Sequence, residues 1–301
     1  MPPPFFSIVI PTRNESADIL RTLESIRDNS FQEYEVLVVD ASTDDTREQV
    51  ARFRDPRVRV LPQDNREGRC GARNQGILAA QGEVAVILNA DVRLPSDFLA
   101  RLKQHYDAGA DYVIVEAEVE NTRHPNGAMV QAEHLHLYRQ GRETVNWCEG
   151  YSCRRRCAIA AGLFPTGHPI PICAGEDAVF GEKMAALGKR KEDFSLVVTH
   201  EVPEEFEVYW DQRVGRGEGC AQRRVYLDRW PLWRVFAEGL VCTVKSAAWI
   251  GLVFPMLHYC RNLHLNLPSL PAWRFIWPVF ISRFAHEVGR WDAFCETLKR
   301  L

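Results

Sequence analysis

Mostly apolar runs of four to six residues alternate with helix-like stretches from residue 5 to about 120, and this alternation constrains the fold most. The first run, Phe5–Ile10, ends at Pro11, and the second, Val36–Val39, ends at Asp40. Continuous apolar runs are typical of strands that are buried on both faces of a parallel sheet. Three further runs follow the same pattern: Val58–Leu61, Val84–Leu88 and Tyr112–Val115.

The segments between these runs have the periodicity of amphipathic helices. Ser16 is placed to cap the first, with Ile19, Leu20, Leu23 and Ile26 on one face. The other expected helices cover residues 46–53, 73–80 and 96–106. Strand and helix in strict alternation predict an α/β fold with a doubly wound, parallel sheet. Ligands of such sheets bind outside the carboxyl ends of the strands, so polar residues there are the first candidates for a site.

Composition and missing motifs exclude several classes of function. The formal net charge of −3 lacks the basic excess that is typical of nucleic-acid binders. The turn after the first run, Pro11–Glu15, contains no glycine, which excludes a dinucleotide-binding GxGxxG turn, and no P-loop is found. Phosphates must therefore be held by a metal ion or by arginines. The N-terminus has no basic segment before an apolar one, and nine cysteines form no CxxC pair, so we expect no signal peptide and a cytoplasmic protein with reduced thiols.

Five segments, in order and spacing, resemble family 2 glycosyltransferases of the GT-A fold. They are Phe6–Glu15, Val38–Thr46, Gly71–Gly76, Leu88–Asp91 and Gly175–Asp177. The resemblance implies a GT-A-type doubly wound, mostly parallel sheet flanked by helices, and inverting transfer of a sugar from a nucleotide-sugar donor. It covers residues 5 to about 225, so we expect a glycosyltransferase domain at 1–225 and a helical, aromatic-rich extension at 226–301.

The resemblance places the donor's nucleotide at the ends of the first two strands. Asp40 would contact the base, and Pro11 and Thr12 would line the same pocket. Asn14 and Glu15 belong to the same segment, although Glu15 is equally suited to a first helical turn, where the dipole favours an acid.

The diphosphate and a divalent metal ion, Mg²⁺ or Mn²⁺, are expected beside them. Arg69 and Arg73 are candidate phosphate ligands, since a pyrophosphate favours bidentate cationic donors. Asp91 is the expected metal ligand, and Asn89 and Ala90 precede it in a motif where an acid is usual at position 89. His200, at the end of the run Leu196–Thr199, is either a further metal ligand or a structural histidine.

Asp177 is the candidate general base, because inverting transfer needs one carboxylate to take the acceptor's proton. Glu176 would be its positioning partner, and both acids open a helix expected to end at Gly188. Gly150 begins a segment that resembles the family's acceptor-side loop, where a glycine lets the backbone approach the donor sugar.

The C-terminal third is rich in tryptophan, phenylalanine, leucine and basic residues. The apolar run Ser246–Cys260 is interrupted by Pro255 and is shorter than the roughly 20 residues of a membrane-spanning helix. Two interpretations stay open: helices that lie on the inner face of a membrane, or a helical subdomain packed on the core. The first suits a lipid-linked saccharide or envelope-glycan acceptor.

Three functions compete at this stage. The first is hexosyl transfer from a UDP-sugar, with GDP-sugars not excluded, to a hydroxyl acceptor. The second is a catalytically silent nucleotide-sugar-binding protein, favoured by Asn89 and opposed by Asp91 and Asp177. The third, a nucleotidyltransferase, lacks the Gly- and Lys-rich first loop that such enzymes use to grip a triphosphate.

Overall fold

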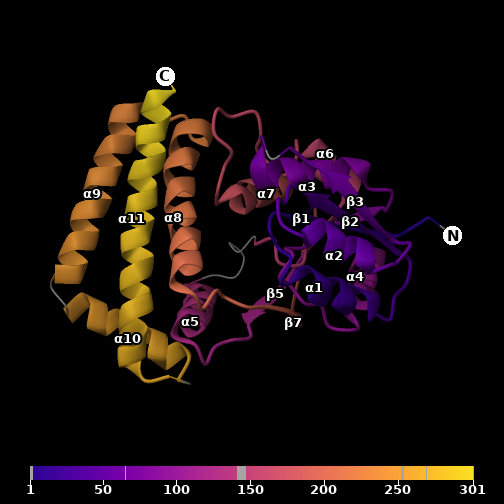
Figure 1. Ribbon diagram of the computed structural model, residues 1–301, viewed down its shortest axis with the longest axis horizontal. Coiled ribbons are helices and arrows are strands. Elements are labelled where there is room, and N and C mark those ends of the chain that lie inside the picture. The colour runs from indigo at the N-terminus through magenta and orange to yellow at the C-terminus, as the bar shows by residue number, and fades with distance from the viewer. Residues whose placement is uncertain (1–2, 65, 141–146, 252–253, 269, 301) are drawn as a thin grey trace. The chain divides into compact units, whose positions relative to one another are not determined.

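The computed structural model describes residues 3–64, 66–140, 147–251, 254–268 and 270–300 (Figure 1). These residues form two compact units. Unit 1 takes its residues from 1–118, 146–167 and 176–200, and unit 2 from 119–145, 168–175 and 201–301. The spatial division therefore differs from the single boundary at residue 225, and the domain assignment made from the sequence stays a prediction.

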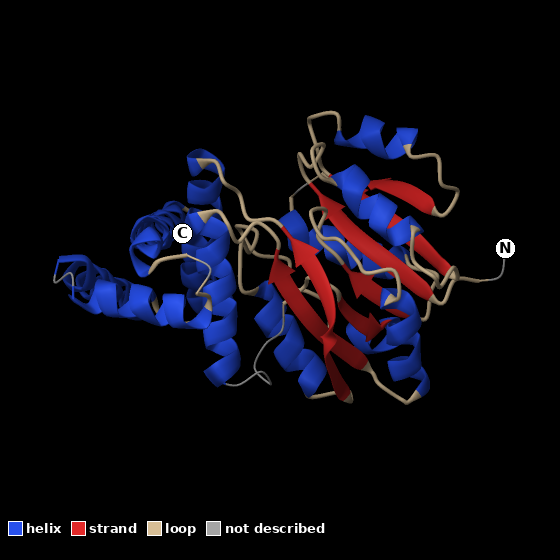
Figure 2. Cartoon of the chain, turned by 90° about the horizontal axis from the view of Figure 1, so that it is seen from below, coloured by secondary structure: helices blue, strands red, loops and turns tan. Residues whose placement is uncertain are grey.

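A seven-stranded sheet forms the centre of unit 1 (Figure 2). In spatial order the strands are β3 (Val58–Pro62), β2 (Tyr34–Asp40), β1 (Phe6–Thr12), β4 (Val84–Ile87), β6 (Tyr151–Arg154), β5 (Tyr112–Val119) and β7 (Arg190–His200). Strand β1 pairs in parallel with β2 and β4, and β2 pairs in parallel with β3, whereas β6 runs antiparallel between β4 and β5. This confirms the predicted α/β fold with a mostly parallel sheet.

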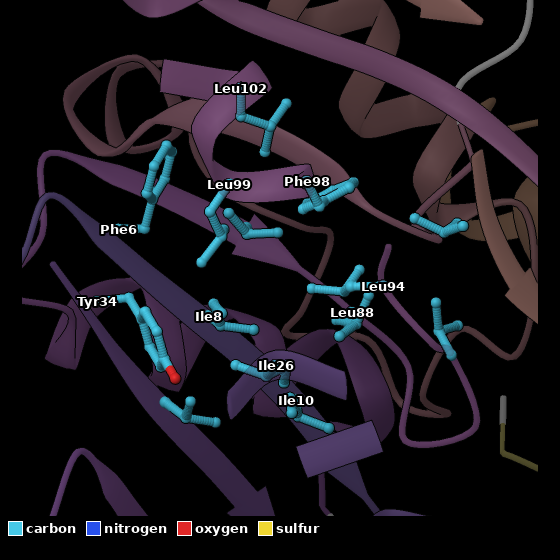
Figure 3. Packing of buried hydrophobic residues seen from close by; sticks show 14 of the residues in the cluster. Phe6, Ile8, Ile10, Ile26, Tyr34, Leu88, Leu94, Phe98, Leu99 and Leu102 are labelled. Atoms are coloured by element: carbon cyan, nitrogen blue, oxygen red, sulfur yellow. The ribbon is translucent and has the colours of Figure 1, made fainter. Parts of the chain in front are cut away.

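One face of the sheet packs against α1 (Ile19–Arg27), α2 (Thr46–Arg52) and α4 (Phe98–Asp107) in one apolar cluster (Figure 3). The Ser16 cap is wrong, because α1 begins only at Ile19 after an Asp18 N-cap. The sequence predicts Leu20 on the buried face of α1, whereas in the structure Thr22 is buried and Leu20 is only partly buried. The Thr22 hydroxyl donates a 2.6 Å hydrogen bond to the Ala90 carbonyl, which satisfies the polar group in the core.

Helix α3 (Gly68–Ala79) packs on the opposite face through a close approach at Gly76. A Cβ on Gly76 would lie 2.2 Å from Val9 Cγ1, so only glycine lets this helix reach the sheet. The helix begins five residues before Arg73, where the sequence predicts its start, because its glycines weaken the helical pattern that tertiary packing then overrides. Helix α6 (Arg155–Ala160) follows β6, and α7 (Glu176–Ala185) packs its Phe180 ring on Phe164, with ring centroids 4.2 Å apart.

Unit 2 is helical, as expected for the C-terminal extension. Its helices are α5 (Pro125–Gln140), α8 (Phe206–Gln222), η2 (Arg223–Leu227), α9 (Leu232–Gly251), α10 (Phe254–Asn266), η3 (Ala272–Phe275) and α11 (Ile276–Lys299). The backbones of α8 and α11 are in close contact, since a Cβ on Gly217 would lie 2.0 Å from the His286 carbonyl oxygen. Among the described helices none is by itself long and apolar enough to span a membrane; α9 and α10 meet those criteria only as a pair bent by 83°.

Candidate active site

The ends of β1 and β2 form the first part of the candidate site. The strands are in register, so Thr12 lies opposite Asp40 and its hydroxyl donates a 2.8 Å hydrogen bond to Asp40 Oδ1. Arg47 reaches Asp40 Oδ2 from α2 through Nε and Nη2, at 3.1 and 2.9 Å. Burial favours the neutral acid, but hydrogen bonds from Ser42, Thr12 and Arg47 outweigh it and lower the pKa of Asp40. Asp40 is therefore negatively charged near neutral pH, and its carboxylate is held in place by these hydrogen bonds.

The loops after β1 and β2 are joined by Asn14. Its backbone adopts a positive φ of 62°, a conformation that asparagine tolerates better than most residues. Asn14 Oδ1 accepts a 2.9 Å hydrogen bond from the backbone N–H of Thr43, and the backbone N–H of Asn14 donates to Ser42 Oγ at 2.8 Å. Asn14, which the sequence predicts to bind the nucleotide-sugar donor, thus holds the loop that follows Asp40 in place.

Glu15 lies close enough to Asp91 for the charges of the two carboxyl groups to interact. Burial raises its pKa to about 7, and the negative charge of Asp91 adds to this effect. The Glu15 amide donates to Thr46 Oγ1 at 2.9 Å, which ties this residue to the start of α2.

Arg73 is the centre of a buried polar cluster. Its Nη1 donates a 2.7 Å hydrogen bond to Glu176 Oε1, and its Nη2 lies 3.3 Å from Asn89 Oδ1. Its guanidinium stacks over the Phe164 ring at 5.1 Å. Arg73 is thus engaged with a carboxylate of the protein itself. The side chain of Arg69, in contrast, is more than half exposed, and its Nη1 lies 3.8 Å from the same Glu176 oxygen. Of the two predicted phosphate ligands, Arg69 is the more accessible.

Asn89 and Asp91 follow β4 and differ in their surroundings. Asn89 Oδ1 faces Arg73, and its Nδ2 donates a 3.2 Å hydrogen bond to Glu149 Oε1. Burial raises the pKa of Asp91, and the negative charge of Glu149 raises it further. His200 acts in the opposite direction and lowers this pKa. Ala90, between Asn89 and Asp91, is buried and contributes its carbonyl to α1 rather than a side chain to the site.

A divalent ion fits beside Asp91 if the donor supplies most of its ligands. The buried Nε2 of His200 has no hydrogen-bond partner in the described residues, and this imidazole acts electrostatically on Asp91. In the same residues no three His, Cys, Asp or Glu side chains converge on a point where they could hold a metal. One carboxylate and one imidazole suit an ion such as Mg²⁺ or Mn²⁺ that also binds phosphate oxygens and water.

Asp177 and Glu176 open α7, as predicted, and they differ in their surroundings. Glu176 is buried and paired with Arg73, whereas Asp177 is partly exposed. Burial raises the pKa of Asp177 to about 6, and the charges of Glu176 and Glu149 add to the increase. A carboxyl with a pKa close to neutral is suited to take up a proton near pH 7.

Gly150 is required by the local backbone and packing, whereas its predicted approach to the donor sugar stays a prediction. Its φ is +77°, and a Cβ there would lie 2.9 Å from Val115 Cγ2 and 3.1 Å from Val198 Cγ1. The glycine is thus needed for packing between strands, and its amide donates to the Ile87 carbonyl at 3.1 Å.

Glu149 is the functional candidate that the sequence interpretation missed. It contacts Asn89 and raises the pKa of both Asp91 and Asp177. The only signal in the sequence is an acid directly before Gly150, which is too common to be informative. In unit 2, the side chain of Arg213 is buried, with its guanidinium over the Tyr209 ring at 4.7 Å.

The model of the family described as glycosyl transferase family 2 matches residues 7–161, which is about half of the chain. Succinoglycan biosynthesis protein ExoO of Rhizobium meliloti is 36% identical over 114 residues, covering 38% of this chain and 33% of ExoO. The GalNAc(5)-diNAcBac-PP-undecaprenol beta-1,3-glucosyltransferase of Campylobacter jejuni is 31% identical over 121 residues, covering 39% of each chain. The chain thus spans little more than a third of the length of these relatives.

Solved structures agree on the fold. The mannosyltransferase PcManGT of Pyrobaculum calidifontis, solved in complex with GDP-Man and Mn²⁺, superposes with a TM-score of 0.62 at 22% identity. The match covers 96% of this chain and 88% of that one. The sheet of unit 1, the five sequence segments and the match to the family model agree: the chain belongs to glycosyltransferase family 2.

Proposed function

We propose that the protein is an inverting glycosyltransferase that moves a sugar from a nucleoside-diphosphate sugar to a hydroxyl acceptor. The observation that carries this proposal is Asp177, a carboxyl whose pKa is raised to about 6 in a chain of this family. The catalytically silent alternative rests on Asn89, which stands where an acid is usual. In the structure Asn89 donates a 3.2 Å hydrogen bond to the carboxylate of Glu149, so an acid lies next to this position.

In the proposed reaction Asp177 accepts the proton of the acceptor hydroxyl as that oxygen attacks the anomeric carbon. The bond from this carbon to the diphosphate breaks on the opposite face, so the configuration is inverted. Glu176, held by Arg73, keeps the pKa of Asp177 high enough for proton uptake. We expect Glu176 to act on the base as a positioning residue rather than on the substrate.

The donor lies across the ends of β1, β2 and β4 in this proposal. Pro11, Thr12, Asn14 and Asp40 border the nucleotide, and Arg69 faces the diphosphate. Asp91, with His200 beside it, would hold a divalent ion, which would neutralise charge on the departing nucleoside diphosphate. A UDP-sugar is favoured, and GDP-sugars are the alternative, since PcManGT was solved with GDP-Man.

The acceptor class follows from the relatives. One acts, by its name, on an undecaprenol-linked saccharide, and another belongs to succinoglycan biosynthesis. We infer a growing glycan or a lipid-linked saccharide as acceptor, with the protein in the cytoplasm and the helices of unit 2 on the inner face of the membrane.

A screen of nucleotide sugars with Mn²⁺, in which release of free nucleoside diphosphate is measured, tests this function. Release from one donor that is lost with EDTA and in Asp91→Ala supports both the transferase and its metal. Release that survives EDTA removes the metal role from Asp91 and His200. If no donor is either hydrolysed or able to raise the melting temperature, the proposed function is wrong.

A further inference from the structure

The outer face of α9 is apolar along the length of the helix. Trp233, Phe236, Leu240, Val241 and Val244 are all exposed, and Trp233 is 72% exposed. The spacing of three, four, one and three residues places them on one side of the helix. The opposite side packs inside unit 2 and mixes the apolar Val235 with the polar Thr243 and Ser246, so the exposed side of α9 is the more apolar one. This is the reverse of an ordinary surface helix, whose apolar side faces the core.

The exposed aromatic side chains continue beyond α9. Phe254 at the start of α10 is 83% exposed, and Trp273 in η3 and Trp277 in α11 are 68% and 62% exposed. Tryptophan is enriched where an apolar phase meets water, because its ring is apolar and its N–H is polar. The surrounding segment is basic: residues 229–290 contain seven Arg or Lys and two acids, in a chain whose net charge is −3.

A polar pocket of about 330 Å³ lies between α9 and α11, at the edge of this apolar face. Lys245 lies four residues after Val241 on α9 and is exposed. Arg283 lines the same pocket from α11 and stacks over Trp249 at 3.7 Å. Among the described residues neither Lys245 nor Arg283 has a carboxylate partner within ion-pair distance.

The one acid of the pocket is already neutralised inside it. Glu287 Oε1 accepts a 3.0 Å hydrogen bond from Ser246 Oγ, and its Oε2 accepts one from Thr243 Oγ1 at 3.1 Å. Arg290 Nε lies 3.5 Å from the same Oε2. Lys245 and Arg283 therefore leave the pocket with uncompensated positive charge, and Ser282 adds a hydroxyl group to its lining.

We propose that this pocket binds the phosphoryl headgroup of an anionic membrane phospholipid while the outer face of α9 lies in the bilayer surface. The inference deepens the membrane contact of the proposed function by naming the face, the pocket and the lipid class. Two features favour a bilayer over a second copy of the chain as occupant. The pocket and its surroundings carry positive charge, which would repel a copy of themselves, and the exposed tryptophans are suited to an interface between lipid and water.

Vesicle sedimentation tests the proposal, with vesicles of phosphatidylcholine alone and of phosphatidylcholine mixed with phosphatidylglycerol. The full-length protein should bind the mixed vesicles and bind less at high salt. Lys245→Gln should weaken binding about fivefold, since one Lys or Arg near an anionic surface contributes about that factor, and Lys245→Arg should restore it. Leu240→Asn and Val244→Asn should each weaken binding about tenfold by the loss of apolar burial.

Matched controls in unit 1 keep the test specific. Lys191→Gln removes an exposed lysine from β7, and Leu187→Asn changes a leucine that is 55% exposed, against 50% for Leu240. Neither control should alter binding. Circular dichroism melts of every variant show that each is folded.

Several results would overturn the proposal. Wild-type protein that stays in solution with both kinds of vesicle contradicts it, as does binding that is equal in all variants. Inorganic phosphate that protects Lys245 from acylation, without any vesicle binding, would mean a soluble phosphate ligand instead. A dimer in sedimentation velocity that Leu240→Asn dissociates, again without vesicle binding, would mean a second copy. Donor hydrolysis measured without vesicles separates each failure from a failure of the proposed function.

Discussion

Replacement of Glu176 by glutamine should have two linked effects, one on stability and one on the pH dependence of turnover. The side chains of Arg73 and Glu176 are 2% and 4% exposed, and their N–O distance is 2.7 Å. Loss of one charge from a buried pair costs about 3–5 kcal/mol. Glutamine retains a hydrogen-bond acceptor, so we expect the lower end, about 3 kcal/mol, and a melting temperature lower by about 6–12 °C.

The chemical effect arises from the next residue. After burial, the charge of Glu176 is the largest cause of the raised pKa of Asp177, so Glu176→Gln should lower this pKa from about 6. A base must be deprotonated, so wild-type turnover should fall as the pH falls through about 6. At pH 5 about one tenth of wild-type Asp177 is ionised, so kcat/KM should be about 0.1 of its value at high pH. In the variant this ratio should rise toward 1.

The assay is nucleoside diphosphate release as a function of pH, together with urea denaturation of the same samples. Glu149→Gln is the matched control, because Glu149 also raises the pKa of Asp177 but forms no ion pair with an Arg or Lys of the described residues. It should shift the acid limb without the loss of stability. An acid limb that stays near pH 6 in both variants would refute the electrostatic coupling.

Three further predictions concern the scaffold. Gly217→Ala should destabilise the protein by several kcal/mol in urea denaturation, since its Cβ would lie 2.0 Å from the His286 carbonyl oxygen. Gly215→Ala, whose Cβ meets nothing within 4 Å, should instead stabilise α8 by about 1 kcal/mol. If both variants changed the free energy of unfolding in the same direction, the close packing of α8 on α11 would be contradicted. Gly150→Ala should cost about 1–3 kcal/mol in the same assay because of its positive φ and the contact with Val115. Because the pKa of Asp40 is lower in the folded than in the unfolded protein, ionised Asp40 stabilises the fold at pH values above the ordinary carboxyl pKa of about 4. This stabilisation is lost as the pH falls through the lowered pKa of the folded state. Asp40→Asn should therefore reduce stability at pH 7 and flatten its acid dependence, as urea midpoints at several pH values would show.

The sheet could be predicted because its strands are long apolar runs with turn residues at their ends. Asp40 and Asp91 were predicted at strand ends for the same reason. Asp40 is the last residue of β2, whereas Asp91 lies in the turn that follows β4. Strand β6 was missed because its four residues, Tyr151–Arg154, follow a glycine and have no apolar periodicity of their own. Its position between β4 and β5 depends on pairing with strands distant in the sequence.

The contacts within the site could not be read from the sequence. The sequence assigns Arg73 to a phosphate, but in the structure it pairs with Glu176, which lies 103 residues away along the chain. Nothing local predicts such a partner. Glu149 was missed for the same reason, since its effect on Asp91 and Asp177 arises from proximity in the folded chain. The residue types at strand ends were predictable, whereas their electrostatic coupling was not.

The most direct test of the proposed chemistry is Asp177→Asn, with donor binding and turnover measured on the same samples. Asparagine has nearly the same shape and cannot accept the proton. We expect donor binding within a factor of about two of wild type and turnover lower by about 10²–10⁴-fold, the contribution of a general base. Turnover close to wild type, with donor binding intact, would contradict the role of Asp177 as the base.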